Sequence, residues 1–196
     1  MVRILIAGIL GGLVMFIGGA FSHVFLDLET RSFKRLPDEA AAVEFYKAQG
    51  LVAGMYNFPS LPGSFANLSS EEQAKVKTAV NSAYKTGPAG YLIVAPTGED
   101  LMGPRQLIGE FVSNVIAALL AAFIAAHFST AASFSRRWLL IVLLAPISWF
   151  SLTLSFAIWF RFPYPMIQDG LFGALIEWTL VGAVIAGIVR PIMHHR

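Results

Sequence analysis

The chain of 196 residues contains no cysteine and few charged side chains. Without cysteine it has no disulfide framework, no thiolate nucleophile and no cysteine-ligated zinc or iron–sulfur site. Charged residues make up 13% of the sequence, about half of the roughly 25% found in an average soluble domain. Catalytic motifs such as His-Glu-x-x-His or a phosphate-binding loop are also missing. The sequence therefore names no reaction and predicts no cofactor and no catalytic or metal-binding residue.

Long apolar runs are what the chain has instead. Hydrophobic residues make up 56% of the sequence, and four strongly apolar stretches cover residues 4–26, 107–128, 138–160 and 171–189. Each is long enough to cross a hydrocarbon core of about 30 Å as a helix, which takes roughly 20 residues. We therefore predict an all-α membrane protein with four transmembrane helices. The first run exceeds the usual 7–15 apolar residues of a signal peptide, so we expect it to be retained.

A polar insert separates the first two apolar runs and divides the chain into three parts. We predict a first transmembrane helix at 1–26, a small α+β insert at 27–105, and helices two to four within 106–196. Within the insert, turn and capping residues predict helices from Asp38 to about 49 and from Ser69 to about 85. Residues 91–95 predict a strand that pairs with 52–58.

The positions of the basic residues predict the orientation in the membrane. Short segments on one side carry basic residues with no acidic neighbour: Arg3, Arg136, Arg137, Arg190 and Arg196. Short loops rich in Lys and Arg stay in the cytoplasm, whereas long translocated loops largely escape this rule. Both termini are therefore expected inside and the insert outside. The net charge of +2 reflects this topology and does not indicate nucleic-acid binding.

Ionisable side chains inside apolar helices are the candidate functional residues. Glu110 and Glu177 lie near the expected outer ends of helices two and four, and Arg161 ends helix three. His23 and Asp27 stand one helical turn apart near the outer end of helix one. Intramembrane charges are costly and indicate function by default. We predict one shared polar cluster, either a site for a small solute, proton or metal or a set of structural ion pairs.

Small residues predict where helices approach one another. Gly8 and Gly12 form a Gly-x-x-x-Gly pair that Gly19 extends, and Ala183 with Gly187 forms a similar pair on helix four. Such pairs allow close backbone contact, either within the bundle or with another membrane subunit. Three serines share one face of a continuous third helix and are expected to bond to neighbouring helices: Ser148, Ser151 and Ser155.

Several short elements carry a resemblance to a known group of proteins. Besides a glycine-rich first helix that ends near a histidine, they are Tyr56-x-Phe58-Pro59, Gly87-Pro88-x-Gly90, Pro104-Arg105-Gln106-Leu107 and Phe162-Pro163. Together they resemble a group of uncharacterised bacterial multi-pass inner-membrane proteins. The resemblance implies a location in the bacterial inner membrane and implies no activity.

Two functions remain open on the sequence alone. The first is a non-catalytic accessory or scaffold subunit that binds other membrane proteins through the insert and the glycine-rich helix faces, with the lipid bilayer as its other partner. The second is a small transporter that uses the Glu/His cluster. Transport requires polar groups that continue to the middle of the membrane, and the sequence places Glu177 only about two turns from the start of its apolar run. The first function is therefore preferred at this stage, with an enzyme third.

Overall fold

The computed structural model describes residues 1–28, 30–128 and 133–189. It divides the chain into two compact units. The helical unit comprises Met1–Lys34 with Asp100–Arg196, and the small unit comprises Arg35–Glu99. The described chain is mostly helical, with four helices long and apolar enough to cross a membrane and one two-stranded sheet. These features agree with the predicted fold class.

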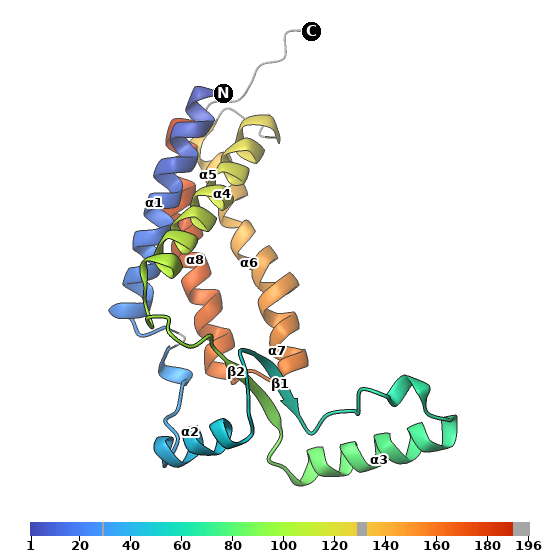
Figure 1. Ribbon diagram of the computed structural model, residues 1–196. Helices are drawn as coiled ribbons and strands as arrows, with labels where there is room; N and C mark the ends of the chain where they lie inside the picture. Colours follow the sequence, from blue (N-terminus) through green and yellow to red (C-terminus); the bar gives the residue numbers. More distant parts are fainter. Residues whose placement is uncertain (29, 129–132, 190–196) are drawn as a thin grey trace. The chain divides into compact units, whose positions relative to one another are not determined.

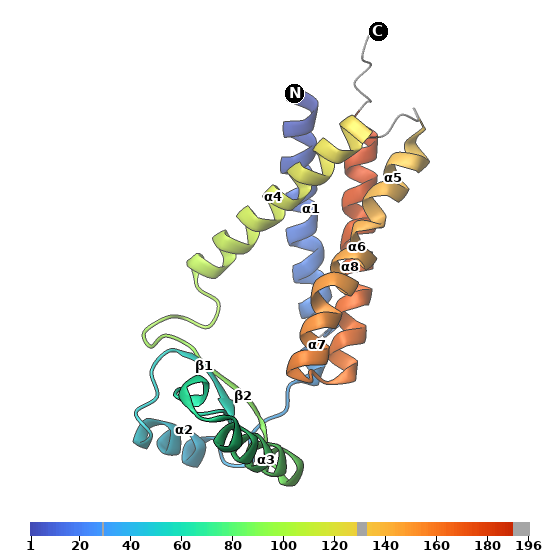
Figure 2. The ribbon, with the colours of Figure 1, turned by 90° about the vertical axis from the view of Figure 1, so that its right-hand side faces the viewer.

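The helical unit contains three uninterrupted long helices and one broken span (Figure 1, Figure 2). The long helices are α1 (Val2–Val24), α4 (Pro104–Phe128) and α8 (Tyr164–Ile188). The broken span consists of α5 (Phe134–Val142), α6 (Leu144–Ser148), the π-helical turn η3 (Trp149–Thr153) and α7 (Leu154–Phe160). A short 3₁₀ turn, η1 (Thr30–Ser32), follows α1.

The break in the third span has a backbone cause. Pro146 has no N–H to bond the carbonyl of Val142, and proline inside a helix interrupts the hydrogen-bond ladder in this way. Beyond it, Ser151 Oγ donates to the carbonyl of Ile147 at 2.7 Å, and Ser148 Oγ donates to that of Ala145 at 2.9 Å. These hydroxyls bond to their own helix, which corrects the expectation that they bond to neighbouring helices.

Glycine and alanine allow α1 to pack closely against α4 and α8. A Cβ added at Gly12 would lie 2.5 Å from the Cα of Val115, and one at Gly8 would lie 2.9 Å from the Cα of Leu119. Alanine supplies much of the buried surface of α4 at this contact: Ala118, Ala121, Ala122, Ala125 and Ala126. The Gly8 and Gly12 pair therefore makes a contact inside this chain.

A different pair of small residues from the predicted one packs α8 against α5. Gly182 lies against the side chain and carbonyl of Trp138, and Ala186 is fully buried. Ala183 and Gly187 are exposed, and no atom would lie within 4 Å of a Cβ at Gly187. The predicted Ala183 and Gly187 pair therefore does not form the intrachain contact, because it lies one residue away from the buried face.

Arg137 has an unexpected position at the end of α8. It is buried, and its Nη2 donates to the carbonyl of Ala186 at 2.9 Å. The last four carbonyls of a helix lack partners within the helix, and cations stabilise that end. Among the arginines expected on the cytoplasmic side, Arg137 thus stabilises the end of α8. Arg190 and Arg196 lie outside the described residues.

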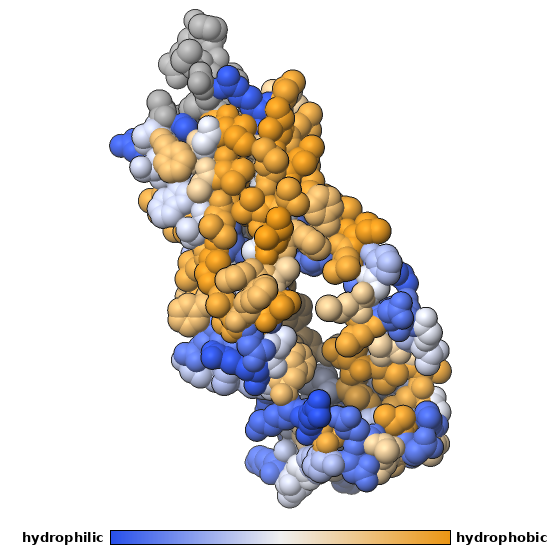
Figure 3. Space-filling view, turned by 90° about the vertical axis from the view of Figure 1, so that its left-hand side faces the viewer, coloured by the Kyte–Doolittle hydropathy of each residue, from blue (hydrophilic) through white to orange (hydrophobic). Residues whose placement is uncertain are grey.

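Aliphatic side chains cover much of the outer surface of the helical unit. Figure 3 shows apolar residues over most of the visible part of this unit. On α1 the exposed members include Leu5, Ile9, Leu13 and Ile17. Exposed apolar surface on this scale is unusual for a protein surrounded by water alone.

The small unit contains α2 (Glu39–Ala48), β1 (Gly54–Phe58), the 3₁₀ turn η2 (Phe65–Asn67), α3 (Ser70–Thr86) and β2 (Gly90–Val94). The strands pair antiparallel with Tyr56 opposite Leu92, which confirms the predicted pairing. Asp38 caps α2, and Ser69 with Glu72 forms a capping box on α3. Hydrogen bonds from the Ser69 hydroxyl and backbone N–H hold the pKa of Glu72 below its ordinary value.

None of residues 35–99, all of which are described, is fully buried. Large apolar side chains remain exposed on both strands, with Met55 at 56% and its cross-strand partner Ile93 at 75%. A two-stranded sheet is marginally stable alone in water. The small unit therefore lacks a closed core of its own.

Three boundaries differ from those expected. The last helix begins at Tyr164, because Pro165 occupies the first turn, where a missing N–H has no cost. α1 ends at Val24, so Asp27 is not helical and has φ 53°. The compact small unit begins at Arg35, later than the predicted start of the insert at 27.

Candidate functional site

The helical unit contains a polar cavity of about 260 Å³. Its lining comes from α1, the segment after α1, α4 and α8: Ser22, His23, Leu28, Glu110, Asp169, Gly170, Gly173, Ala174 and Glu177. Three of the predicted cluster residues, His23, Glu110 and Glu177, thus meet around one space. Asp27 and Arg161 are not among the lining residues.

Glu177 lies much deeper along its helix than the sequence suggested. With α8 starting at Tyr164, Glu177 is about 20 Å along the helix at 1.5 Å per residue, near the middle of its 25 residues. It faces two glycines of α1. A Cβ at Gly19 would lie 3.1 Å from Glu177 Oε1, and one at Gly18 would lie 3.8 Å from its Cγ. Gly19 thus accommodates a carboxylate, and does not extend the contact of Gly8 and Gly12 with α4.

Glu110 and His23 reach the cavity from two other helices. Glu110 is in the second turn of α4, about 9 Å from its first residue at 1.5 Å per residue. His23 is in the last turn of α1, where its Nδ1 is 3.1 Å from the carbonyl oxygen of Leu28. Because a carbonyl oxygen can only accept, Nδ1 is the donor in this bond.

Asp169 is the lining residue with the strongest electrostatic contact. It is fully buried in α8, and Arg31 of η1 binds it through two nitrogens. Arg31 Nε donates to Asp169 Oδ2 at 2.7 Å, and Nη2 donates to Oδ1. The hydrogen bond and the charge of Asp169 raise the pKa of Arg31 above its already high ordinary value. The Arg31 side chain is nevertheless 53% exposed.

The chain reaches this ion pair through a tight turn after α1. Asp27 adopts a left-handed conformation with φ 53°, which aspartate tolerates better than most residues. Thr30 Oγ1 donates to the Asp27 carboxylate, and the Arg31 N–H donates to the Asp27 carbonyl at 3.3 Å. Asp27 therefore stabilises the turn that places Arg31 beside Asp169. Arg161, also left-handed at φ 57°, ends α7.

Ser22 is the one cavity-lining side chain reported as both buried and without a hydrogen-bond partner among the described residues. The residue is 1% exposed. A buried hydroxyl without a partner costs about 1–3 kcal/mol, so such groups in native proteins are usually satisfied by water or a ligand. A polar group inside the cavity would satisfy the Ser22 Oγ.

The lining favours a positively charged occupant. The lining residues include three acidic side chains, of which Asp169 is paired with Arg31, and His23 is the one basic side chain among the nine. Among the described residues, neither this cavity nor any other place brings three His, Asp or Glu side chains close enough together to hold a metal ion. Charges distributed around a space suit a proton or a cation of several atoms better than a compact metal ion.

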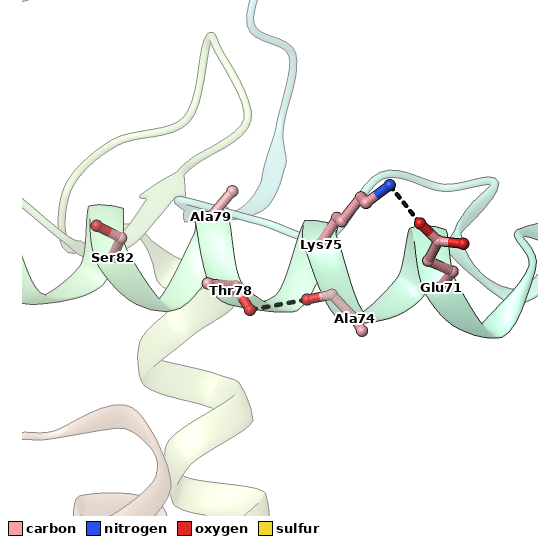
Figure 4. A pocket seen from close by; sticks show the side chains of 6 residues that line it. All are labelled: Glu71, Ala74, Lys75, Thr78, Ala79 and Ser82. Carbon is pink, nitrogen blue, oxygen red and sulfur yellow. Dashed lines mark hydrogen bonds and ion pairs between the residues drawn. The ribbon is translucent and has the colours of Figure 1, made fainter.

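A second depression, on α3 of the small unit, is not a comparable site. It has a volume of about 480 Å³, and one helix supplies its whole lining: Glu71, Ala74, Lys75, Thr78, Ala79 and Ser82 (Figure 4). Lys75 Nζ donates to Glu71 Oε1 at 2.6 Å, an exposed i,i+4 pair of the kind common on helix surfaces. One helix face offers no opposing wall to enclose a ligand.

Comparisons of the chain with models of known families, with curated proteins and with solved structures find no match.

Sequence reasoning missed two lining residues. Asp169 precedes the apolar run predicted at residues 171–189, although Pro165 four residues earlier is a helix-start signal that places it inside α8. Its partner Arg31 is 138 residues away, and no local pattern predicts such a pair. Ser22 carries no sequence signal, because a single serine in an apolar helix usually bonds to its own backbone.

Proposed function

We propose that the chain is a multi-pass membrane protein that binds a small cation in the cavity of its helical unit and carries it across the membrane. Four long apolar helices with exposed aliphatic surfaces support the membrane location. The acidic lining of the cavity supports a cationic solute.

The position of Glu177 carries the proposal. Transport requires polar groups that reach the middle of the spans, and an ionisable residue there marks a pathway by default. Glu177 lies near the middle of α8, opposite Gly18 and Gly19 in the last two turns of α1, and it lines the cavity. This depth reverses the order of the two functions suggested by the sequence alone, in which transport came second.

Replacing Glu177 with glutamine is the direct test. The purified protein in liposomes should pass protons, followed by a trapped pH dye, or isotopically labelled guanidinium faster than protein-free liposomes do. Glu177→Gln keeps the shape of the side chain and removes its charge. Because a hydrogen bond to a charged group contributes about 1.5–3 kcal/mol, the flux should fall by roughly 10-fold or more.

Glu71→Gln is the matched control, because Glu71 is an exposed carboxylate on α3 outside the cavity. Its flux should equal that of the unmodified protein. Absence of flux for both probes, or equal flux in Glu177→Gln, would contradict transport.

We further propose that both termini face the cytoplasm of a bacterial cell, with the small unit outside its inner membrane. Arg3 and Arg136 lie near the starts of α1 and α5, and these two starts are at one end of the helical unit (Figure 1). Basic residues in short segments favour the cytoplasmic side. The resemblance noted in the sequence supports the bacterial location.

Single cysteines report this orientation without background, because the chain has none of its own. An impermeant maleimide should label Ser70→Cys in intact cells and should label Ser135→Cys only after permeabilisation. Both serines belong to the described part and are exposed. The reverse labelling pattern would overturn the orientation.

One observation favours a second function, that of an accessory subunit that binds other membrane proteins. The small unit has no buried residue and leaves Met55 and Ile93 exposed, and a partner could cover them. The liposome experiment separates the two functions, because an accessory subunit alone moves no solute.

A further inference from the structure

We infer that Asp169 anchors a binding site for a guanidinium or primary ammonium group of a small solute, and that Arg31 is a tethered occupant of this site. The inference rests on the proposed function, because it assigns the chemical class of the cation that the cavity takes. Arg31 would hold the site in the absence of solute and yield it when solute binds.

The first argument is the mismatch in burial between the two partners. Asp169 is fully buried, whereas the Arg31 side chain is 53% exposed. A carboxylate removed from water is stabilised by a charged partner, so Asp169 favours a cation at this position. Half-exposed Arg31 keeps part of its hydration and loses little when it moves into water. A cation is thus favoured beside Asp169, and the guanidinium of Arg31 can be replaced there by another cation.

The second argument is the geometry of the pair. Arg31 presents Nε and Nη2 to the two oxygens of Asp169, which is the two-pronged recognition that a planar guanidinium makes with a carboxylate. A free guanidinium can reproduce both bonds. A primary ammonium can reproduce them singly, with fewer donors in a fixed plane.

The third argument is that Asp169 alone does not account for the cavity. Beyond the ion pair lie Glu110, Glu177 and the unpartnered hydroxyl of Ser22. The Ser22 Oγ is independent of the acidic cluster and requires a polar contact from whatever fills the space. A volume of about 260 Å³ lies just below the 300–1,000 Å³ of drug-sized pockets, so the solute is small.

The way in which Arg31 is held fits an occupant that can leave. Its turn η1 has three residues and follows the left-handed Asp27. The contacts that shape this turn are local bonds from Thr30 and from the Arg31 N–H to Asp27. Rotation of the Arg31 side chain alone would release Asp169 and leave these local contacts of the turn intact.

Chemical rescue of Arg31→Ala in the full-length purified protein tests the inference. The variant removes the Arg31 guanidinium from the buried Asp169 and should melt at a lower temperature than the unmodified protein. Low-millimolar methylguanidinium should restore most of the lost melting temperature, and methylammonium should restore part of it. Tetramethylammonium has no N–H donor and should restore none at equal ionic strength.

Two further variants keep the test decisive. In Arg31→Ala/Asp169→Asn the anchor is gone, so methylguanidinium should have no effect. If Arg31→Ala does not fold, Arg31→Lys retains a cation with a single donor group, and methylguanidinium should still raise its melting temperature. Equal responses to methylguanidinium and tetramethylammonium, or no response in either Arg31 variant, would overturn the inference.

The outcomes also separate this inference from the proposed function. Rescue by methylguanidinium without flux in liposomes would retain the Asp169 site and reject transport. Flux that depends on Glu177 without rescue would retain transport and reject Arg31 as an occupant of the solute site.

Discussion

Replacing Gly12 with leucine is expected to separate α1 from α4 and to produce the largest loss of stability among the substitutions considered. A Cβ at this position would lie 2.5 Å from the Cα and 2.7 Å from the backbone nitrogen of Val115. Backbone atoms cannot rotate away as a flexible side chain can. Overpacking typically costs about 1–3 kcal/mol, and the loss here should reach at least the upper end of that range. Thermal unfolding in detergent measures it.

Gly187→Leu is the matched control, because it makes the same change on α8 where no atom would lie within 4 Å of the new Cβ. Its melting temperature should stay close to that of the unmodified protein. Equal stability of the two variants would show that α1 and α4 do not pack at Gly12. Loss of a partner with unchanged stability in Gly12→Leu would instead assign this glycine to an interface between subunits.

The second large effect is an asymmetry between the two halves of the Arg31–Asp169 ion pair. Arg31→Ala removes the guanidinium from a fully buried carboxylate, whereas Asp169→Asn leaves a guanidinium that is already half in solvent. An uncompensated buried charge is far more destabilising than an exposed one. Arg31→Ala should therefore lower the melting temperature by several degrees more than Asp169→Asn does.

A double-mutant cycle completes this measurement. Adding Asp169→Asn to Arg31→Ala removes the buried negative charge that Arg31 no longer neutralises, so the double variant should be more stable than Arg31→Ala alone. Lys75→Ala serves as the reference, because its pair with Glu71 is exposed on both sides and should contribute little. Equal effects of Arg31→Ala and Asp169→Asn would indicate that Asp169 is solvated in the absence of Arg31.

The features of the fold that were predictable are those written in local chemistry. Ser69 and Glu72 specify the start of α3 through a capping box, and the aromatic and β-branched composition of residues 91–95 specifies a strand. The ends of the helices were harder to predict from the sequence. The apolar run predicted for the last helix begins only at residue 171, whereas α8 begins at Tyr164, with Pro165 in its first turn.

The candidate site was predictable in part for the same reason. Glu110, Glu177 and His23 stand out because each is an ionisable residue in an apolar run, and the structure places all three on one cavity. Arg31 and Asp169 belong to segments that look solvated in the sequence. Only the tertiary structure brings them together. Asp169, the acidic lining residue with the strongest electrostatic contact, was therefore not predictable from the hydrophobic pattern.

The π-helical turn at Trp149–Thr153 changes the directions in which the side chains of the third span point. A π turn accommodates one residue more than an α turn does, and each α-helical residue corresponds to a rotation of about 100°. Everything after Thr153 is therefore displaced by about that angle from its place on a continuous helical wheel. Ser148 and Ser151 are exposed while Ser155 is half-buried, although a regular wheel puts the three on one side. The side chains of α7 therefore point in directions that a single regular helix through the whole third span would not predict.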